Sequence, residues 1–496
     1  MITRGRALKL RPLLLALPSL LVCACAARRV AVELPGTPPP LAPQDLALWK
    51  NPPPPAPDVV TRLPLDVRRI ALDNGVHVTV VARPGTATTA IALRVPSMRD
   101  ASNGPVAVMA KALRAGTRSG RDDLLINPKL GEPIGIDTSN AGTLFSWEVL
   151  PRASATALGL LAAFALSPTF NPPDVTVHLR QELGLIQRHS GSLAHMHEIV
   201  HSAFPGLKGP TPEADAKGLV KMTPAMLRQV HACTLRPEGT ELVVVGPVAF
   251  EDVATWAKAA FGGWRAARPP ADPACAEWVR PPVPAHPELA RLSRMELQIV
   301  YGYFDPVMIV SVPGPDPVSE DYLTFSLLTE VLAARSASAS RALRDLGATY
   351  GIRGSSFDEY AGLSLFDLSG QIDPEAAQEA LRTLVADMRT IADNLEAPEV
   401  SVVARRWRNE VVTSLGSNSA TARWMFWQLR RGREASTFPA LLGEIAGIDL
   451  ARCRDVARRW LSPAQPSIGV MGLPGRFVKG LGLDVRVNKF YWNPTF

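Results

Sequence analysis

The residue pattern with the clearest catalytic chemistry is His197-Glu198-Ile199-Val200-His201. On a helix, residues at positions i and i+4 lie on one face, so His197 and His201 can bind one zinc ion together. Glu198 can act as general base on a zinc-bound water, which is the chemistry of the HExxH zinc proteases. One hypothesis is therefore an active zinc metallopeptidase that uses His197, Glu198 and His201.

The residues around this motif favour a structural helix instead. Leu193, Met196, Val200 and Phe204 form an apolar stripe at helical spacing. The two histidines lie at the flank of this stripe, where histidines are commonly surface residues. Phe204 and Leu207 also stand where the longer metzincin motif needs glycine and histidine. We therefore expect surface histidines here and do not favour a bound metal.

The N-terminal segment has chemistry of another kind. A basic start, an apolar stretch over residues 13–22 and small residues after it are typical of an export signal. Residues 22–25, with the sequence VCAC, resemble a bacterial lipobox, which predicts that Cys25 is lipidated and anchors the protein in a membrane. Ala26, in place of aspartate, favours the periplasmic face of the outer membrane. The alternative is ordinary secretion with cleavage a residue or two further on.

The other cysteines of the exported chain are Cys233, Cys275 and Cys453. Their wide spacing matches neither a disulfide framework nor a zinc knuckle. We expect them to pack in the core, and one disulfide is an open alternative outside the cytoplasm.

Composition and charge indicate a globular protein. The chain has 496 residues, of which 47% are hydrophobic and 20% charged, enough for at least two domains with buried cores. Four basic residues lie in the expected signal, and their removal lowers the formal charge from +7 to +3. So small and scattered an excess does not indicate nucleic-acid binding.

Two proline-rich stretches divide the chain. The first is expected to be an extended tether and the second a linker between two halves of similar length. The predicted parts are a signal peptide (1–24), a tether (25–61), a first domain (62–268), a linker (269–290), a second domain (291–475) and a C-terminal tail (476–496).

The two halves contain copies of one unit. Residues 223–246 and 449–472 align without a gap, 226 positions apart. Each copy has an N-cap residue (Thr223 or Asp449), an amphipathic helix, Leu-x-Pro, a short apolar strand and a closing glycine. Each half also mixes alternating and helical periodicity. This pattern predicts two α+β domains, each with helices packed on a mainly antiparallel sheet.

From Arg62 to Gly472 the chain resembles the insulinase (pitrilysin-like) peptidase family. Residues 72–76 (LDNGV) are similar to the opening strand of that family. Residues 204–264, with VVVG at 243–246 and FGGW at 261–264, are similar to the end of its first domain. The resemblance implies two duplicated α+β domains.

Active members of this family carry the inverted zinc motif HxxEH, with two histidine ligands and a glutamate base. The matching segment here is Gly104 to Thr117, and the ligand and base positions fall on Ala107, Ala110 and Lys111. Alanine cannot bind zinc, and a lysine ammonium repels it. The resemblance therefore implies a member that has lost its catalytic site and binds no zinc there.

The resemblance also suggests three further residues. Glu182 matches the downstream glutamate ligand, although an ordinary solvated helix glutamate is an equally good interpretation. Arg344 and Tyr350 match an arginine and a tyrosine that contact substrate near the scissile bond. A surface arginine and a core tyrosine are the alternative for these two.

Together these observations predict a non-catalytic homologue in the cell envelope. It would bind an extended peptide or pair with an active homologous peptidase subunit, as the divided bacterial members of the family do. The other hypotheses are the zinc metallopeptidase described above and an envelope scaffold with no peptide role. No cofactor is favoured, and zinc belongs only to the metallopeptidase hypothesis.

Overall fold

The computed structural model describes most of the chain beyond residue 62. The chain divides into two compact units, Met1–Val59 and Val60–Phe496, and every described residue belongs to the second. The predicted signal, the tether and Cys25 lie outside the described residues. The described residues are 63, 65–96, 104–113, 130–139, 142–189, 193–205, 217–269, 272–275, 278, 291–301, 306–345, 349–360, 363–372, 374, 377–430, 432–472, 477 and 481–491.

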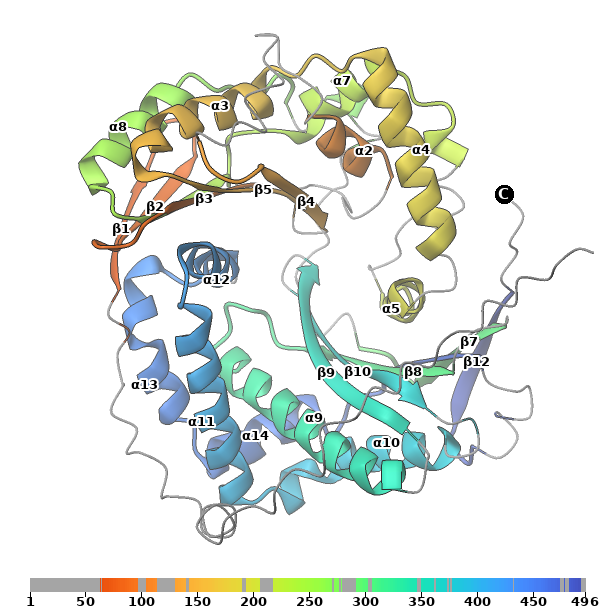
Figure 1. Ribbon diagram of the computed structural model, residues 1–496. Helices are drawn as coiled ribbons and strands as arrows, with labels where there is room; N and C mark the ends of the chain where they lie inside the picture. Colours follow the sequence, from red (N-terminus) through yellow and green to blue (C-terminus); the bar gives the residue numbers. More distant parts are fainter. Residues whose placement is uncertain are drawn as a thin grey trace, which may run out of the picture. The chain divides into compact units, whose positions relative to one another are not determined.

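The first half contains a six-stranded sheet. Its strands are β1 (Asp66–Ala71), β2 (His77–Ala82), β3 (Thr89–Val95), β4 (Gly135–Ser139), β5 (Gly142–Val149) and β6 (Glu241–Gly246). They lie in the order β1-β2-β6-β3-β5-β4 (Figure 1). Only β2 and β6 pair in parallel, and the other neighbours are antiparallel. All residues of β6 are buried, as its run of apolar residues predicts for a central strand.

Helices cover one face of this sheet. The helices of the first half are α2 (Gly104–Ala112), α3 (Ser154–Leu166), α4 (Pro172–His189), α5 (Leu193–His201), α7 (Pro224–Thr234) and α8 (Phe250–Phe261), with the short 3-10 turns η3 (Pro151–Ala153) and η4 (Pro273–Cys275). In Figure 1, α2, α3, α7 and α8 lie on the same side of the sheet. Their apolar sides and the sheet share one core, which includes the fully buried Phe145, Phe164 and Phe261.

The second half repeats this arrangement. Its strands are β7 (Met295–Tyr301), β8 (Val307–Gly314), β9 (Thr349–Tyr360), β10 (Leu363–Ile372), β11 (Ser467–Met471) and β12 (Val485–Tyr491). The order β12-β7-β11-β8-β10-β9 repeats that of the first sheet in five strands. The sixth differs, because β1 is antiparallel to its neighbour and β12 is parallel to β7. Strand β12 comes from the C-terminal tail, so the tail completes the second sheet.

Helices again build a core on the second sheet. They are α9 (Tyr322–Asp345), α10 (Ala377–Asn394), α11 (Ala397–Ser414), α12 (Asn418–Arg430), α13 (Leu441–Ala446) and α14 (Leu450–Trp460), with the 3-10 turn η6 (Ala435–Ala440). Apolar residues of β7, β8, β10 and β11 pack with those of α9, α10, α11 and α14 in this core. The predicted α+β fold class, with a mainly antiparallel sheet in each half, is confirmed.

The two copies of the repeated unit fold alike. The side chain of Thr223 accepts a hydrogen bond from Met226 N (3.2 Å), and that of Asp449 accepts one from Arg452 N (2.8 Å). These bonds cap the helices α7 and α14, which lead into the strands β6 and β11. The predicted caps, helices and strands of the unit are therefore confirmed.

Each half also sends one helix to the sheet of the other half. Helix α12 packs on β3, β5 and β6, where Met425 is fully buried among valines and alanines of the first sheet. Helix α5 packs on β7, β8 and β11, where Met196 and Val200 are buried (Figure 1). Gly469 of β11 permits the close approach, since a Cβ there would lie 2.6 Å from Met196 Sδ. This exchange ties the two halves together through two apolar interfaces.

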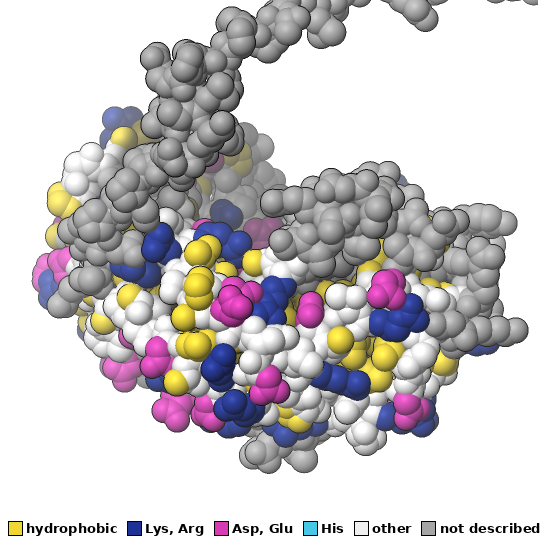
Figure 2. All heavy atoms as spheres, turned by 90° about the horizontal axis from the view of Figure 1, so that it is seen from below, with side chains coloured by type: hydrophobic (Ala, Val, Ile, Leu, Met, Phe, Trp, Pro, Cys, Tyr) yellow, Lys and Arg dark blue, Asp and Glu magenta, His cyan; other side chains and the backbone are white. Residues whose placement is uncertain are grey.

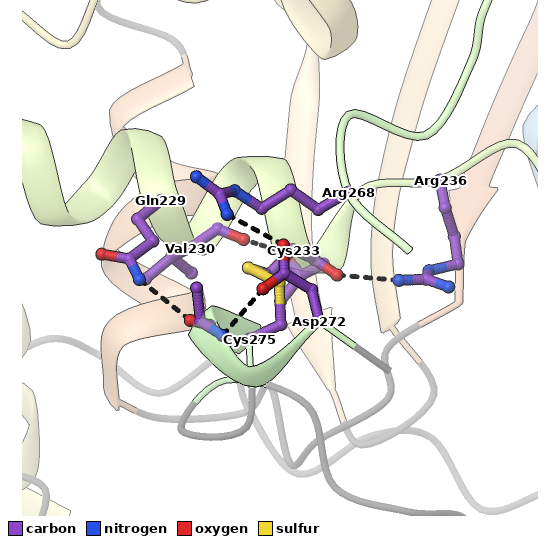
Figure 3. Close-up of a disulfide and its surroundings, with 9 residues drawn as sticks. Gln229, Val230, Cys233, Arg236, Arg268, Asp272 and Cys275 are labelled. Atoms are coloured by element: carbon purple, nitrogen blue, oxygen red, sulfur yellow. Dashed lines mark hydrogen bonds and ion pairs between the residues drawn. A yellow bond between two sulfur atoms is a disulfide. The ribbon is translucent and has the colours of Figure 1, made fainter. Parts of the chain in front are cut away.

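A disulfide joins Cys233 of α7 to Cys275 of η4 (Figure 3). Hydrogen bonds surround it: Gln229 Nε2 donates to Ala274 O (2.9 Å), and Arg268 pairs with Asp272 at 2.8 Å. The bond thereby fixes the first part of the predicted linker to the first half. Both cysteines are buried in the core of the first half, as expected, and the fold joins them in the disulfide that the sequence left open, whereas Cys453 is a free, buried thiol.

Removing this disulfide is expected to destabilise the protein. The bond closes a loop with a sequence separation of 42, and losing it frees the unfolded chain. We expect the Cys233→Ala/Cys275→Ala variant to unfold about 5 °C below wild type in a thermal melt. A reductant should lower the wild-type midpoint by a similar amount and leave the variant unchanged. Equal midpoints for oxidised and reduced wild type would contradict this expectation.

The surface seen in Figure 2 carries mixed charges. Basic and acidic side chains are interspersed with apolar ones, and in the described part of this face no stretch of one charge dominates. One partly exposed ion pair of the second half joins Arg406 of α11 to Glu330 of α9. Among the described helices, none has the length and apolarity needed to cross a membrane.

Candidate functional site

The positions that match the HxxEH motif lie on α2, in the core of the first half. Ala107 and Ala110 are fully buried, and their methyl groups offer no donor atom to a metal. Helix α2 packs against α4, α7 and β4. Neither position can therefore supply a metal ligand or a general base.

Lys111 and Glu182 form an ion pair between α2 and α4. The Glu182 side chain is only 1% exposed, whereas that of Lys111 is 30% exposed. Glu182 is therefore not a solvated helix glutamate, because it is buried and its Oε2 accepts a hydrogen bond from the lysine ammonium. Its Oε1 is buried without a hydrogen-bond partner. The carboxylate that the resemblance assigns to the zinc shell is thus buried, with a cation beside it.

Zinc does not fit these residues. A catalytic zinc site needs three protein ligands, and here one carboxylate faces two alanines and an ammonium. The ammonium supplies part of the positive charge that a metal would bring to the buried carboxylate, so the charge of Glu182 is compensated without a metal ion. Hydrolysis by the mechanism of the inverted motif therefore has neither its ligands nor its base.

The HEIVH residues lie elsewhere, at the contact between α5 and the second sheet. His201 is 5% exposed and His197 is half-buried. His197 Nδ1 lies 2.6 Å and His201 Nε2 lies 2.8 Å from the same oxygen, Oδ2 of Asp367 on β10. The expectation of surface histidines was therefore wrong. The flank of α5 that looks solvent-facing within its own half is covered by the sheet of the other half.

Asp367 is the residue that the motif search missed. It is fully buried, and it belongs to a strand paired on both sides with β8 and β9. Burial by itself raises the pKa of Asp367, but the charges and hydrogen bonds of His201 and His197 outweigh it and hold that pKa well below its usual value. The carboxylate is thus ionised, and its Oδ1 has no hydrogen-bond partner. A charged residue in the apolar strand sequence LSLFDLSGQI was the available signal.

Arg344 and Tyr350 are placed only by their backbones. Arg344 lies in the last turn of α9, and Tyr350 is the second residue of β9, the edge strand of the second sheet. Their side chains lie outside the described part of the structure. Their suggested substrate contacts remain predictions.

Residues 221–405 match the family model described as Peptidase M16 inactive domain. The match begins just before α7 and ends within α11, so it spans the link between the halves and much of the second half. A comparison with curated proteins finds no match.

Several solved structures share the fold. A peptidase M16 inactive domain from Pseudomonas fluorescens is 16% identical, with a TM-score of 0.69 over 83% of this chain and 99% of that one. A protease from Helicobacter pylori is 13% identical, with a TM-score of 0.68 over 83% of this chain and all (100%) of that one. The periplasmic protease PqqL from Escherichia coli is 14% identical, with a TM-score of 0.62 over 84% of this chain and 49% of that one. The family match over residues 221–405 and the shared two-sheet fold confirm the predicted resemblance to the insulinase-type, M16 peptidase family.

Proposed function

We propose that this chain is a non-catalytic M16 family member that binds an extended peptide without cleaving it. The observation that carries the proposal is the ion pair of Lys111 with the buried Glu182, beside two buried alanines. Loss of the metal ligands alone would leave an uncompensated carboxylate in the core. The lysine offsets that charge, which favours a protein adapted to work without the metal.

The first sheet offers a place for an extended peptide. β4 is its last strand, and no described strand pairs with the outer edge of β4. An open strand edge presents N–H and C=O groups that an extended peptide can pair with. Because α2 contacts β4, a peptide added there would lie close to the degenerate positions, which are Ala107, Ala110 and Lys111 on α2. Without zinc ligands or a base at these positions, the peptide would stay intact.

Pairing with an active homologous subunit is the second candidate function. The positions of Arg344, at the end of α9, and of Tyr350, at the start of the edge strand β9, favour it. An arginine and a tyrosine at such an edge could contact a substrate held by another chain's zinc site. Co-purification of a chain with an intact HxxEH motif would support this function, and a monomer in native extracts would count against it.

The place of action that we propose is the cell envelope, through a lipid on Cys25. The Cys233–Cys275 disulfide supports export, since such bonds persist mainly in oxidising compartments. Labelling cells with a radioactive fatty acid tests the anchor. We expect label on the wild-type protein and none on a Cys25→Ala variant.

A backbone-modified peptide distinguishes strand addition from other binding. A peptide whose binding is measured by fluorescence anisotropy is resynthesised in two versions. Each version carries N-methyl groups on alternate residues, and the methylated positions of the two versions differ by one residue. Because only one set of N–H groups faces β4, one version should abolish binding and the other should retain it. Mass spectrometry should recover the peptide uncut after incubation. Equal binding of both versions would argue against strand addition, and cleaved peptide would argue against the non-catalytic assignment.

A further inference from the structure

We propose that His197, His201 and Asp367 form a structural zinc site that joins the two halves of the chain. Among the described residues, these three form a group of histidine and carboxylate side chains whose ligand atoms lie within 4.8 Å of one another. The site is separate from the degenerate positions on α2, and it needs no peptidase activity.

The geometry of the three side chains suits a shared ion. His197 Nδ1 and His201 Nε2 lie 2.6 and 2.8 Å from Asp367 Oδ2, so both imidazoles point at one carboxylate oxygen. Ligand atoms around a tetrahedral zinc are about 3.3 Å apart, since each lies about 2.0–2.2 Å from the ion. Each nitrogen–oxygen separation therefore has to widen by only about 0.6 Å to admit the metal.

The three ligands are held by packed elements. His197 and His201 are one turn apart on α5, which is fixed against the second sheet by the buried Met196 and Val200. Asp367 lies on β10, between β8 and β9. A site built on a helix and an inner strand keeps its geometry better than one built on loops.

Buried oxygen atoms without partners also favour a cation here. Asp367 has no exposed surface, and its Oδ1 is buried without a hydrogen-bond partner. The hydroxyl of Ser311, its cross-strand neighbour on β8, is likewise buried without a partner. Two imidazoles and a carboxylate are ligands that zinc accepts, and a divalent ion would offset the buried negative charge.

Burial assigns the ion a structural role. The exposed fractions of the side chains are 16% for His197, 6% for His201 and 0% for Asp367. A catalytic zinc needs a position open to water and substrate, and these three side chains are largely buried. With ligands from α5 of one half and β10 of the other, zinc would strengthen the contact between the halves.

Zinc titration of the metal-stripped full-length protein, by calorimetry, tests the site. We expect about one Zn²⁺ per chain for wild type, and a thermal midpoint that rises when zinc is added. Asp367→Asn should weaken zinc binding by about 100-fold or more, because it removes a ligand, and should abolish the rise in the midpoint. His197→Gln is the second variant, because the partial exposure of His197 lets the protein fold even if Asp367→Asn does not.

Two control variants separate this site from other metal binding. His178→Ala removes a half-buried histidine of α4, and Lys111→Met/Glu182→Met removes both charges of the ion pair between α2 and α4; both should bind zinc as wild type does. Wild type without zinc binding would overturn the proposal. So would a folded Asp367→Asn or His197→Gln variant that binds zinc as tightly as wild type.

Discussion

Restoring the three lost residues with Ala107→His, Ala110→Glu and Lys111→His is expected to create a zinc site on α2. Positions 107 and 111 are one helical turn apart, and Glu182 already lies beside position 111 as a third ligand. In a His197→Gln background, zinc content should rise from near zero to about one equivalent after dialysis against a weak chelator.

This reconstruction has a structural cost. Ala107 and Ala110 have no exposed surface, so larger side chains there crowd the core, at a cost of about 1–3 kcal/mol. Circular dichroism and a thermal melt should therefore show a folded but less stable protein. Adding Glu182→Gln should remove the gained zinc. A folded triple variant that gains none would contradict the match of α2 to the zinc motif.

Replacing Lys111 by alanine is expected to lower the free energy of unfolding by about 3 kcal/mol. The reason is that Glu182, 1% exposed, loses the cation beside it. This value is at the low end of the range for breaking a buried ion pair, because Lys111 is partly exposed. Urea unfolding at neutral pH measures the change.

The double variant Lys111→Met/Glu182→Met is the control. It removes both charges and keeps similar volumes, so it should recover most of the lost stability. Lys111→Arg should stay close to wild type. If Lys111→Ala and the double variant were equally unstable, the lost packing of the lysine stem, and not the stranded carboxylate, would explain the effect.

The parts of the fold that depend on local patterns were predictable. Thr223 and Asp449 are helix caps whose partners lie three residues away, and the strands that follow are short apolar runs. The absence of metal-binding side chains at Ala107 and Lys111, where the resemblance places the zinc ligands, was also visible, because it depends only on residue type and spacing. Because the unit is duplicated, the same helix and strand could be predicted in both halves.

The surroundings of the HEIVH residues were not predictable from those patterns. Asp367 is 170 residues from His197 and 166 from His201, and only the exchange of α5 between the halves brings them together. Amphipathicity identifies the apolar side of a helix and says nothing of which sheet covers its polar flank. The disulfide pairing could not be predicted for a similar reason. Three cysteines allow several pairings, and the fold brings Cys233 and Cys275 together.

The measurement that tests the central claim most directly is peptide cleavage by the purified full-length protein with zinc supplied. A mixture of extended peptides is incubated with it and analysed by mass spectrometry, beside the reconstructed triple variant. We predict that wild type leaves every peptide intact, because Ala110 stands in place of the base and Lys111 in place of a ligand. Chelator-sensitive cleavage by wild type would contradict this account, and its loss in a Glu198→Gln variant would assign the activity to the HEIVH residues.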